Sequence, residues 1–310
     1  MNALKTTGEF KSSDGIHQIR YYVYAPAEPP RAILQISHGM CEYIERYEEF
    51  ADALCRHGFL VCGNDHLGHG PMAKESGDLG YFGPKDGWKL LPEDLHLLTL
   101  RMKKQYPGLP YFLLGHSMGS FVARRYLSRY GDELNAAVIM GTSGGNPFAG
   151  VGILLAKAVI RMRGEKYVSR MLADISMGGY NKRFSEENDK NSWLSREVSI
   201  RNKYAGDELC SFTFTASGYR DLFSLLRSVS GRDWAETVPK DLPVLLTSGG
   251  MDPVGDFGQG VTRVYHRLKE AGVRDVELKL YPESRHEVLN ETDREQVYED
   301  VRAYLEKHMG

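Results

Sequence analysis

Residues Gly115-His116-Ser117-Met118-Gly119 lie between a short apolar stretch, Tyr111–Leu114, and a segment with helical spacing, Phe121–Leu127. A strand that runs through Gly-x-Ser-x-Gly directly into a helix places the serine on a sharp turn. The serine backbone is strained there, and side chains larger than hydrogen at the two flanking glycines would collide with the turn. The turn also leaves backbone N–H groups free to bind a developing oxyanion. The stretch predicts that Ser117 is a nucleophile, supported by His116 and the two glycines.

The same pattern occurs a second time, at Gly141-Thr142-Ser143-Gly144-Gly145, also after an apolar stretch, Ala136–Met140. With 33 glycines in 310 residues, chance matches to so short a motif are expected. No helix follows this second match at once, because Asn146–Gly150 has the composition of a loop. We therefore interpret Ser143 as part of a turn at the end of a strand.

The composition is that of an ordinary globular protein, with 42% apolar and 26% charged residues. A net charge of −2 provides no basic surface, which argues against a nucleic-acid partner. The N-terminus lacks the apolar core of a signal peptide, and the longest strongly apolar stretch, Phe148–Ile160, is too short to span a bilayer. The cysteines lack CxxC spacing and predict reduced, buried thiols in a cytoplasmic protein. They are Cys41, Cys55, Cys62 and Cys210.

Strand-like and helix-like segments alternate along most of the chain. Alternation of this kind predicts an α/β fold, with a mostly parallel central sheet flanked by helices. The alternation stops between about residues 144 and 230, where only helices and loops are expected. We interpret 144–230 as a helical cap inserted after the sixth strand, between core segments 1–143 and 231–310. The predicted strands are Gly8–Lys11, Ile16–Tyr24, Ala32–Ser37, Phe59–Cys62, Tyr111–Leu114, Ala136–Met140, Leu242–Thr247 and Val276–Tyr281. The predicted helices are Glu45–His57, Trp88–Tyr106, Phe121–Tyr130, Phe257–Ala271 and Glu291–His308.

A nucleophilic serine needs a base to take its proton and an acid to orient that base. In this type of fold the partners follow in the order Ser, Asp or Glu, His, on loops after late strands. Asp252 and Asp256 both follow the strand that ends at Thr247. Asp252 lies nearer the strand and is the predicted acid, whereas Asp256 is expected to cap the next helix. His286 follows the last strand and is the predicted base.

Two backbone N–H groups are needed to bind the oxyanion of the tetrahedral intermediate. Met118, directly after the predicted nucleophile, supplies one. The second is expected from the loop after the strand Ala32–Ser37, which reads His38-Gly39-Met40. Gly39 would allow that loop to approach closely, so the N–H of Met40 is the predicted second donor; a plain strand-exit turn is the alternative.

Two further features have two interpretations each. Asp65, His66 and His69 are residue types that bind zinc, but no distant third ligand stands out, and hydrogen bonds within the loop are the favoured interpretation. No metal and no cofactor are therefore predicted. The apolar segment Phe148–Met162 is compatible with transient membrane or micelle contact, or with lining an acyl pocket. Ordinary packing of a cap helix explains it equally well.

Several of these residues together resemble the monoacylglycerol lipase and lysophospholipase group of the α/β-hydrolases, also described as serine aminopeptidase-like. The resemblance extends over nearly the whole chain, and the block Asp65-His66-Leu67-Gly68-His69-Gly70 is its most specific part. It includes Gly115–Gly119 and His286–Leu289. Departures from the group's pattern are Tyr43, Pro71-Met72 and Ser120, which lie near the expected pocket. The resemblance implies a serine hydrolase that acts on a small-molecule acyl ester or lipid.

The sequence thus predicts a serine carboxylic-ester hydrolase that uses Ser117, Asp252 and His286 and forms an acyl-enzyme. Monoacylglycerols, lysophospholipids and short acyl esters are the expected substrates. Amide or peptide hydrolysis is an alternative, for which the acidic pairs Glu186-Glu187 and Asp207-Glu208 would have to recognise an amine. A non-catalytic ligand receptor on the same fold is a second alternative, which the three filled positions argue against.

Overall fold

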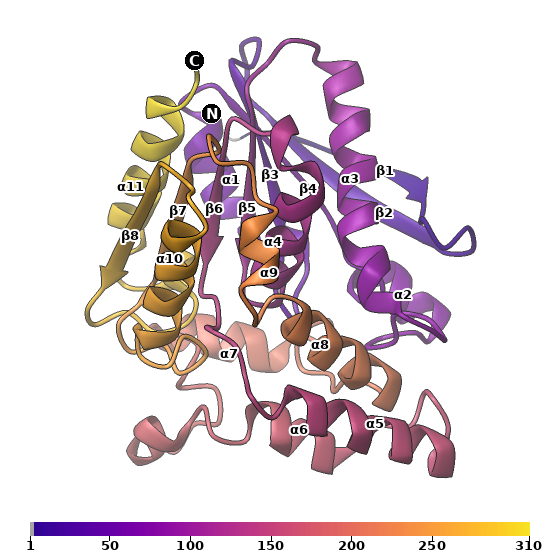
Figure 1. Ribbon diagram of the computed structural model, residues 1–310. Coiled ribbons are helices and arrows are strands. Elements are labelled where there is room, and N and C mark those ends of the chain that lie inside the picture. The colour runs from indigo at the N-terminus through magenta and orange to yellow at the C-terminus, as the bar shows by residue number, and fades with distance from the viewer. Residues whose placement is uncertain (1–2) are drawn as a thin grey trace.

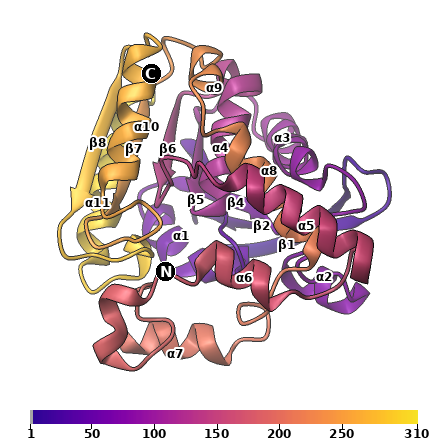
Figure 2. The same cartoon turned by 60° about the horizontal axis from the view of Figure 1, so that its bottom comes forward.

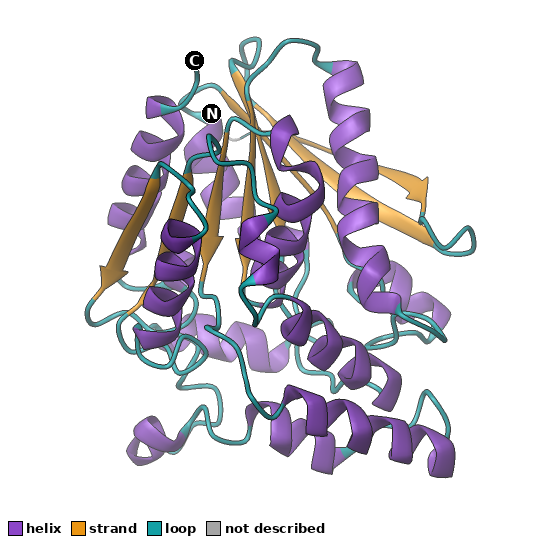
Figure 3. Ribbon diagram, in the orientation of Figure 1, coloured by secondary structure: helices purple, strands orange, loops and turns teal. Residues whose placement is uncertain are grey.

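The computed structural model describes residues 3–310, which form an eight-stranded sheet with helices on both faces (Figure 1, Figure 3). The strands lie in the order β1-β2-β4-β3-β5-β6-β7-β8. The pairs β1–β2 and β2–β4 are antiparallel, and the remaining pairs are parallel, as the sequence predicted. The strands are β1 Leu4–Lys11, β2 Gln18–Ala25, β3 Ala32–Ser37, β4 Phe59–Asn64, β5 Tyr111–His116, β6 Ala136–Met140, β7 Val244–Gly249 and β8 Val276–Tyr281.

The central strands β3 to β7 are buried along their whole length, because helices cover both faces of the parallel part of the sheet. One hydrophobic cluster joins the sheet to α3, α4, α8 and α10, and a second joins the opposite face to α1 and α11. The α-helices are α1 Glu48–Cys55, α2 Gly70–Ser76, α3 Gly87–Gln105, α4 Met118–Tyr130, α5 Ala149–Arg163, α6 Arg170–Met177, α7 Val198–Gly206, α8 Ala216–Ser228, α9 Asp233–Glu236, α10 Gln259–Glu270 and α11 Arg294–Lys307. The 3₁₀ helices are η1 Ile44–Tyr47, η2 Gly131–Glu133, η3 Lys182–Glu187 and η4 Val288–Asn290.

Residues 141–243, between β6 and β7, form a helical segment that we call the insertion. Its strand-like pairing is limited to one bridge between Val168 and Thr215, within a segment that is described throughout. Helix α5 packs against α8, and α5, α6 and α7 lie beyond the carboxyl ends of the parallel strands (Figure 1, Figure 2). The insertion therefore lies at the edge of the sheet where open α/β folds bind ligands. The cap boundaries at 144 and 230 stay a prediction.

Two details differ from the sequence-based expectations. Helix α10 begins at Gln259 with Gly258 at its N-cap, so the prediction that Asp256 caps this helix is wrong. The reason is that Asp256 and Phe257 both have positive φ angles, 52° and 53°, and the chain turns there before the helix starts. The Gly-rich loop after β4 contains a short helix, α2, which was not predicted; Pro71 stands in its first turn.

All four cysteines are free and buried in the structure. Among the helices of residues 3–310, none combines the length and apolar character that crossing a bilayer requires.

Candidate functional site

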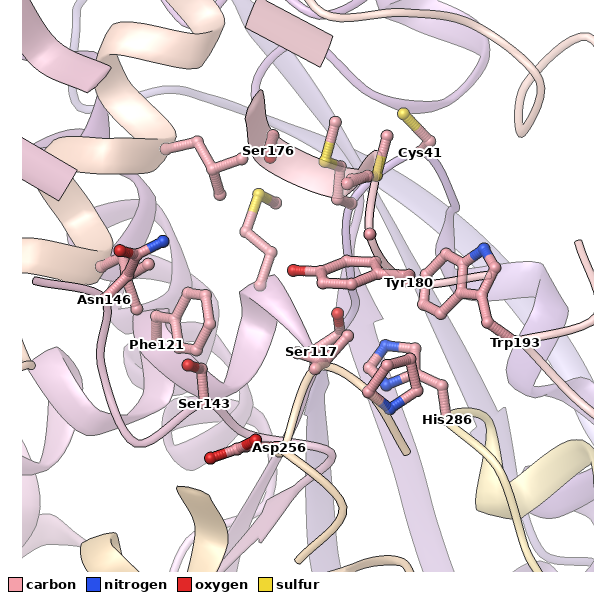
Figure 4. Close-up of a pocket in the computed structure, with 18 of the residues that line it drawn as sticks. Cys41, Ser117, Phe121, Ser143, Asn146, Ser176, Tyr180, Trp193, Asp256 and His286 are labelled. Carbon is pink, nitrogen blue, oxygen red and sulfur yellow. The ribbon is translucent and has the colours of Figure 1, made fainter. Parts of the chain in front are cut away.

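Ser117 occupies the junction between β5 and α4 in a strained conformation. Its φ and ψ angles are 53° and −121°, and non-glycine residues rarely adopt a positive φ. The backbone N–H of Ser117 donates a 3.0 Å hydrogen bond to the carbonyl of Met140, at the end of the neighbouring strand β6. Strain of this kind persists only where the surrounding structure holds it. The turn leaves the Ser117 side chain facing a cavity (Figure 4).

The glycines of the turn are required because other backbone lies against them. A Cβ atom at Gly115 would lie 2.5 Å from the carbonyl oxygen of Gly119. A Cβ atom at Gly119 would lie 2.0 Å from the carbonyl oxygen of Ser37, at the end of β3. Both distances are far below van der Waals contact. The two glycines therefore allow β3, β5 and α4 to meet closely around Ser117.

Asp252 and His286 come from the loops after β7 and β8 and meet in the interior. Asp252 Oδ1 lies 3.0 Å from His286 Nδ1, and both residues are buried. Asp252 also accepts hydrogen bonds from Ser248 Oγ at 2.9 Å and from the N–H of Val254 at 2.8 Å. Burial alone would raise the pKa of Asp252, but His286 and these donors hold that pKa below its usual value. The carboxylate is thus ionised and orients the imidazole.

With Nδ1 directed at Asp252, the other ring nitrogen of His286 is the one available to the cavity. Figure 4 shows His286 beside Ser117 in this cavity. Three side chains that lie far apart in the sequence are therefore brought to one place, in the order that the fold requires. The arrangement is suited to proton transfer between a serine hydroxyl and an imidazole.

The loop after β3 passes directly against Ser117. A Cβ atom at Gly39 would lie 3.0 Å from Cβ of Ser117 and 2.5 Å from Oε1 of Glu42, so only glycine fits. Met40 and Met118 both line the cavity at this point. Met118 is the first residue of α4, where helix N–H groups lack partners within the helix.

A buried polar cluster lies next to this loop. Glu42 accepts hydrogen bonds from the N–H of Gly39, from Tyr47 Oη at 2.8 Å and from Arg46 Nη1 at 2.8 Å. Arg46 in turn makes two hydrogen bonds, of 2.8 and 2.7 Å, to the carboxylate of Glu287. The cluster connects the β3 loop to the residue that follows His286.

The histidines of the β3 and β4 loops are structural in this arrangement. His38 Nε2 accepts the N–H of His66 at 2.9 Å, His66 Nε2 lies 2.9 Å from Ser37 Oγ, and His69 Nδ1 lies 3.1 Å from the carbonyl of Leu67. Burial lowers the pKa of His38 to about 4 and that of His69 to about 3. These contacts fit the interpretation that hydrogen bonds, rather than a metal, organise the loop.

Asp65 connects the loop after β4 to the start of η1, because its Oδ1 accepts the N–H of Ile44 at 3.0 Å. Within the described residues, the group of side chains close enough to share a metal is elsewhere, at Asp275, Glu277 and His308. Lys307 Nζ donates to Glu277 at 2.6 Å in that group, so an ion pair accounts for its carboxylate.

The cavity has a volume of about 520 Å³ and is lined by both the core and the insertion. Volumes of this size hold molecules of drug or lipid dimensions. Its apolar wall combines residues of α4, α6 and α8, and part of its rim is polar. The apolar wall is formed by Phe121, Ile175, Met177, Leu222, Phe223 and Leu226. The polar rim is formed by Ser143, Asn146, Asp256 and Arg263.

Trp193 of the insertion lies against His286. The sequence analysis did not identify Trp193 as a residue of the site. Its ring lies 5.0 Å from that of His286 and 5.1 Å from that of Tyr180. The N–H of His286 donates to the carbonyl of Trp193 at 3.3 Å, and the N–H of Glu287 donates to that of Leu194 at 2.8 Å. These contacts attach the insertion to the histidine loop (Figure 4). No local sequence pattern marks Trp193, because its partner His286 lies nearly a hundred residues away.

Ser143 behaves as the sequence predicted, since α5 begins only at Ala149 and no helix follows the motif at once. Ser143 Oγ accepts the N–H of Gly145 at 3.2 Å. Two departures from the family pattern also have structural roles. Tyr43 Oη donates to Asp207 at 2.8 Å, which links the β3 loop to the insertion, and Ser120 Oγ donates to Thr142 at 2.7 Å.

Comparisons with known proteins agree with this architecture. A profile of the serine aminopeptidase S33 family matches residues 28–293. A monoacylglycerol lipase from Mycolicibacterium smegmatis is 28% identical over 316 residues, which is 100% of both chains. The monoglyceride lipase of Homo sapiens is 29% identical, over 89% of this chain and 81% of the human one. The structure of a thermostable carboxyl esterase from Bacillus coagulans, determined with glycerol, matches 99% of both chains at 32% identity and a TM-score of 0.92.

The family profile covers most of the chain, and the structural match extends over both proteins from end to end. The site described above lies where α/β-hydrolases bind their substrates. The chain therefore belongs to the serine aminopeptidase S33 family of α/β-hydrolases and is a hydrolase of its monoacylglycerol lipase-like group.

Proposed function

We propose that the protein is a serine carboxylic-ester hydrolase that uses Ser117, Asp252 and His286 as its catalytic triad. The observation that carries the proposal is the strained turn at Ser117, next to a buried Asp252–His286 pair with a 3.0 Å contact. Strain at a serine has no packing role in a sheet and is typical of a nucleophile held in place. The same cavity offers an apolar wall that suits an acyl chain.

The proposed reaction begins when His286 takes the proton of Ser117 Oγ as this oxygen attacks the ester carbonyl carbon. The carbonyl oxygen becomes an oxyanion and accepts hydrogen bonds from the N–H groups of Met40 and Met118. The bond between carbon and the alcohol oxygen then breaks, and His286 gives its proton to the departing alcohol. Water, deprotonated by His286, attacks the acyl carbon. The bond from this carbon to Ser117 Oγ then breaks, His286 returns the proton to Ser117 Oγ, and the carboxylic acid leaves.

Monoacylglycerols and lysophospholipids, followed by short acyl esters, are the proposed substrates. The apolar wall formed by α4, α6 and α8 would take the acyl chain. The polar rim, with Ser143 and Asp256, would face the alcohol part of the ester. The names of the similar proteins, two of them monoacylglycerol lipases and one a carboxyl esterase, support the same assignment.

Amide and peptide hydrolysis is less well supported, because three of the four carboxylates in the acidic pairs already have partners. Glu187 forms ion pairs with Arg201 and Arg285. Asp207 accepts the Tyr43 hydroxyl, and Glu208 is paired with Lys74 on the surface. A carboxylate that is already paired binds a substrate amine weakly. The paired carboxylates of the insertion are therefore poorly suited to bind an amine, and we favour an ester as the substrate.

We further propose that residues 144–230 form a cap whose outer face meets a lipid surface. Large apolar side chains are exposed on α5 and α6, with Phe148 at 70% and Leu154 at 67% exposure. Phe148 and Ile175 also line the cavity, so the apolar surface continues into its mouth. Cations surround this surface, which suits anionic lipid. They are Lys157, Arg161, Arg163, Lys166 and Arg170.

The decisive test combines covalent labelling with a substrate series. A fluorophosphonate probe should label Ser117 of the wild-type protein, and Ser117→Ala should lose both labelling and esterase activity, by about 10,000-fold or more. Ser143→Ala should keep the label. Esters of increasing acyl length, measured below and above their critical micelle concentration, would identify the substrate class. Unchanged hydrolysis by Ser117→Ala would rule out the proposed triad.

A further inference from the structure

His116, the residue before Ser117, lies between the two loops that the proposed reaction uses. It is buried, at 5% exposure, at the carboxyl end of β5. On one side lies the loop after β3, with Gly39 and Met40. On the other side lies the loop after β8, with His286, whose ring is 4.8 Å from that of His116. A residue in this position can affect both loops at once.

Both ring nitrogens of His116 face hydrogen-bond acceptors. Nδ1 lies 3.1 Å from Glu42 Oε1 and 3.1 Å from Tyr47 Oη. Tyr47 Oη also lies 2.8 Å from Glu42 Oε1, and an ionised carboxylate can only accept, so the contact between Nδ1 and Glu42 requires a proton on Nδ1. Nε2 lies 3.3 Å from the carbonyl oxygen of His286, which can only accept. A neutral imidazole has one donor and one acceptor, so only the imidazolium satisfies both contacts.

The charges around His116 lead to the same conclusion. The buried cluster contains two carboxylates, Glu42 and Glu287, and one guanidinium, Arg46, which pairs with both. One negative charge would remain without compensation in the interior, which is costly. The imidazolium of His116 is in direct contact with Glu42 and balances it.

The groups that surround His116 determine its pKa. Burial lowers the pKa of His116, but Glu42, Glu287 and the carbonyl of His286 raise it above the usual value. Arg46, Tyr47 and the buried, neutral His38 complete its surroundings on the β3 and η1 side.

We propose that His116 is a positively charged positioning residue that, through Glu42 and the carbonyl of His286, holds the oxyanion loop and the base loop at a set distance. Glu42 is the connecting group, because the oxygen that contacts His116 also accepts the N–H of Gly39. Loss of the charge would release the Gly39–Met40 loop on one side and His286 on the other. This inference deepens the proposed function and depends on it for its catalytic consequence.

The first test needs no measurement of activity. The imidazole nitrogens of His116 would be followed by NMR in the full-length protein labelled with ¹⁵N-histidine, and His116→Asn would assign the signal. At neutral pH, two protonated nitrogens are expected on His116. A neutral tautomer at that pH would overturn the proposal, whatever the enzyme hydrolyses.

The second test separates positioning from folding. Glu42→Gln and His116→Asn should each lower kcat by about 10- to 100-fold, as small misplacements of reacting groups do, with little change in KM. The matched control is Asp94→Asn, which removes a buried carboxylate that accepts from Ser12 and Ser13 far from the site. The control should lose stability and keep kcat.

The outcomes are distinguishable. If wild-type Ser117 is not labelled by fluorophosphonate, the proposed function fails, while the NMR result still decides the charge on His116. If Ser117 is labelled and the two variants fall only as far in kcat as Asp94→Asn, the positioning role is overturned. If the variants fail to fold, triple-resonance assignment of the wild-type protein identifies the His116 nitrogens, and their spectrum settles the charged state.

Discussion

The core loops and the insertion face the same cavity but are built by different rules. On the core side, Asp252, His286 and Glu42 are at most 3% exposed and each has a defined hydrogen-bond partner. On the insertion side, Phe148 and Leu154 expose about two thirds of their surface or more. We therefore propose that the paired polar groups of the core serve the chemistry, whereas the apolar surface of the insertion governs which molecule reaches them.

The largest effect on activity is expected from a change at Asp252, the proposed acid on the core side. Asp252→Asn should lower kcat by about 10,000-fold, because the amide favours the wrong tautomer of His286. The fold should remain, since the asparagine oxygen can still accept from one of the two donors, Ser248 Oγ or the N–H of Val254, which bind different oxygens of Asp252. Measured kcat and circular dichroism of the same sample would check this. Near-normal activity with Asn at this position would remove Asp252 from the mechanism.

A change in the insertion should instead alter which acyl-chain lengths the enzyme hydrolyses. Leu226 of α8 lines the cavity and is only partly buried, so Leu226→Trp would shorten the apolar wall. Each methylene that can no longer enter costs about 0.8 kcal/mol, or about fourfold in kcat/KM. Short acetyl esters should be unaffected and serve as the internal control. An equal loss for short and long esters would indicate damage to the core rather than to the acyl wall.

Changes on the outer face of the insertion should alter binding to lipid vesicles and leave kcat unchanged. Leu154→Asp should weaken binding to vesicles that contain anionic phospholipid by about tenfold, which corresponds to losing the burial of part of a leucine side chain. Leu100→Asp, at a position 48% exposed on α3, is the matched control and should bind normally. Vesicle co-sedimentation at two salt concentrations measures both the apolar and the charged contribution. Identical binding by the two variants would argue against lipid contact through α5.

The smallest expected effect concerns pH and the core cluster. Burial lowers the pKa of His116, but Glu42 and its neighbours raise it above that of the unfolded chain. The folded state thus holds this proton more tightly, and its contribution to stability is complete at acidic pH and lost as pH rises through the folded-state pKa. The stability difference between wild type and His116→Asn should therefore shrink toward alkaline pH in urea unfolding. The comparison is made with His57→Asn, a histidine replacement at an exposed position.

Much of the fold could be predicted because it depends on local patterns. Apolar runs such as Tyr111–Leu114 and the helical spacing after Ser117 indicated strands and helices in the correct order. The short helix α2 was missed, since Gly-rich composition conceals a helix that Pro71 begins. Asp256 was misassigned because the two positive φ angles before α10 leave no mark in residue type.

Some features of the site could also be predicted from the sequence, and others could not. The order of Ser117, Asp252 and His286 and their places after strands could be read from the chain, because strand ends gather at one edge of a parallel sheet. Trp193 and the pairing of Arg46 with Glu287, 241 residues later, could not. Such pairs carry no local periodicity, and many arginines and acids offer equivalent alternatives.

The sequence by itself determined the strained turn, the order of the reactive residues and the alternation that builds the sheet, since each of these is written in neighbouring residues. Only the tertiary structure decided that His116 lies between Glu42 and the carbonyl of His286, and that Trp193 covers the histidine. The physical reason is that protonation and shielding depend on which distant groups pack together once water is excluded. Backbone conformation is local, whereas the electrostatic surroundings of a buried side chain are a property of the whole fold.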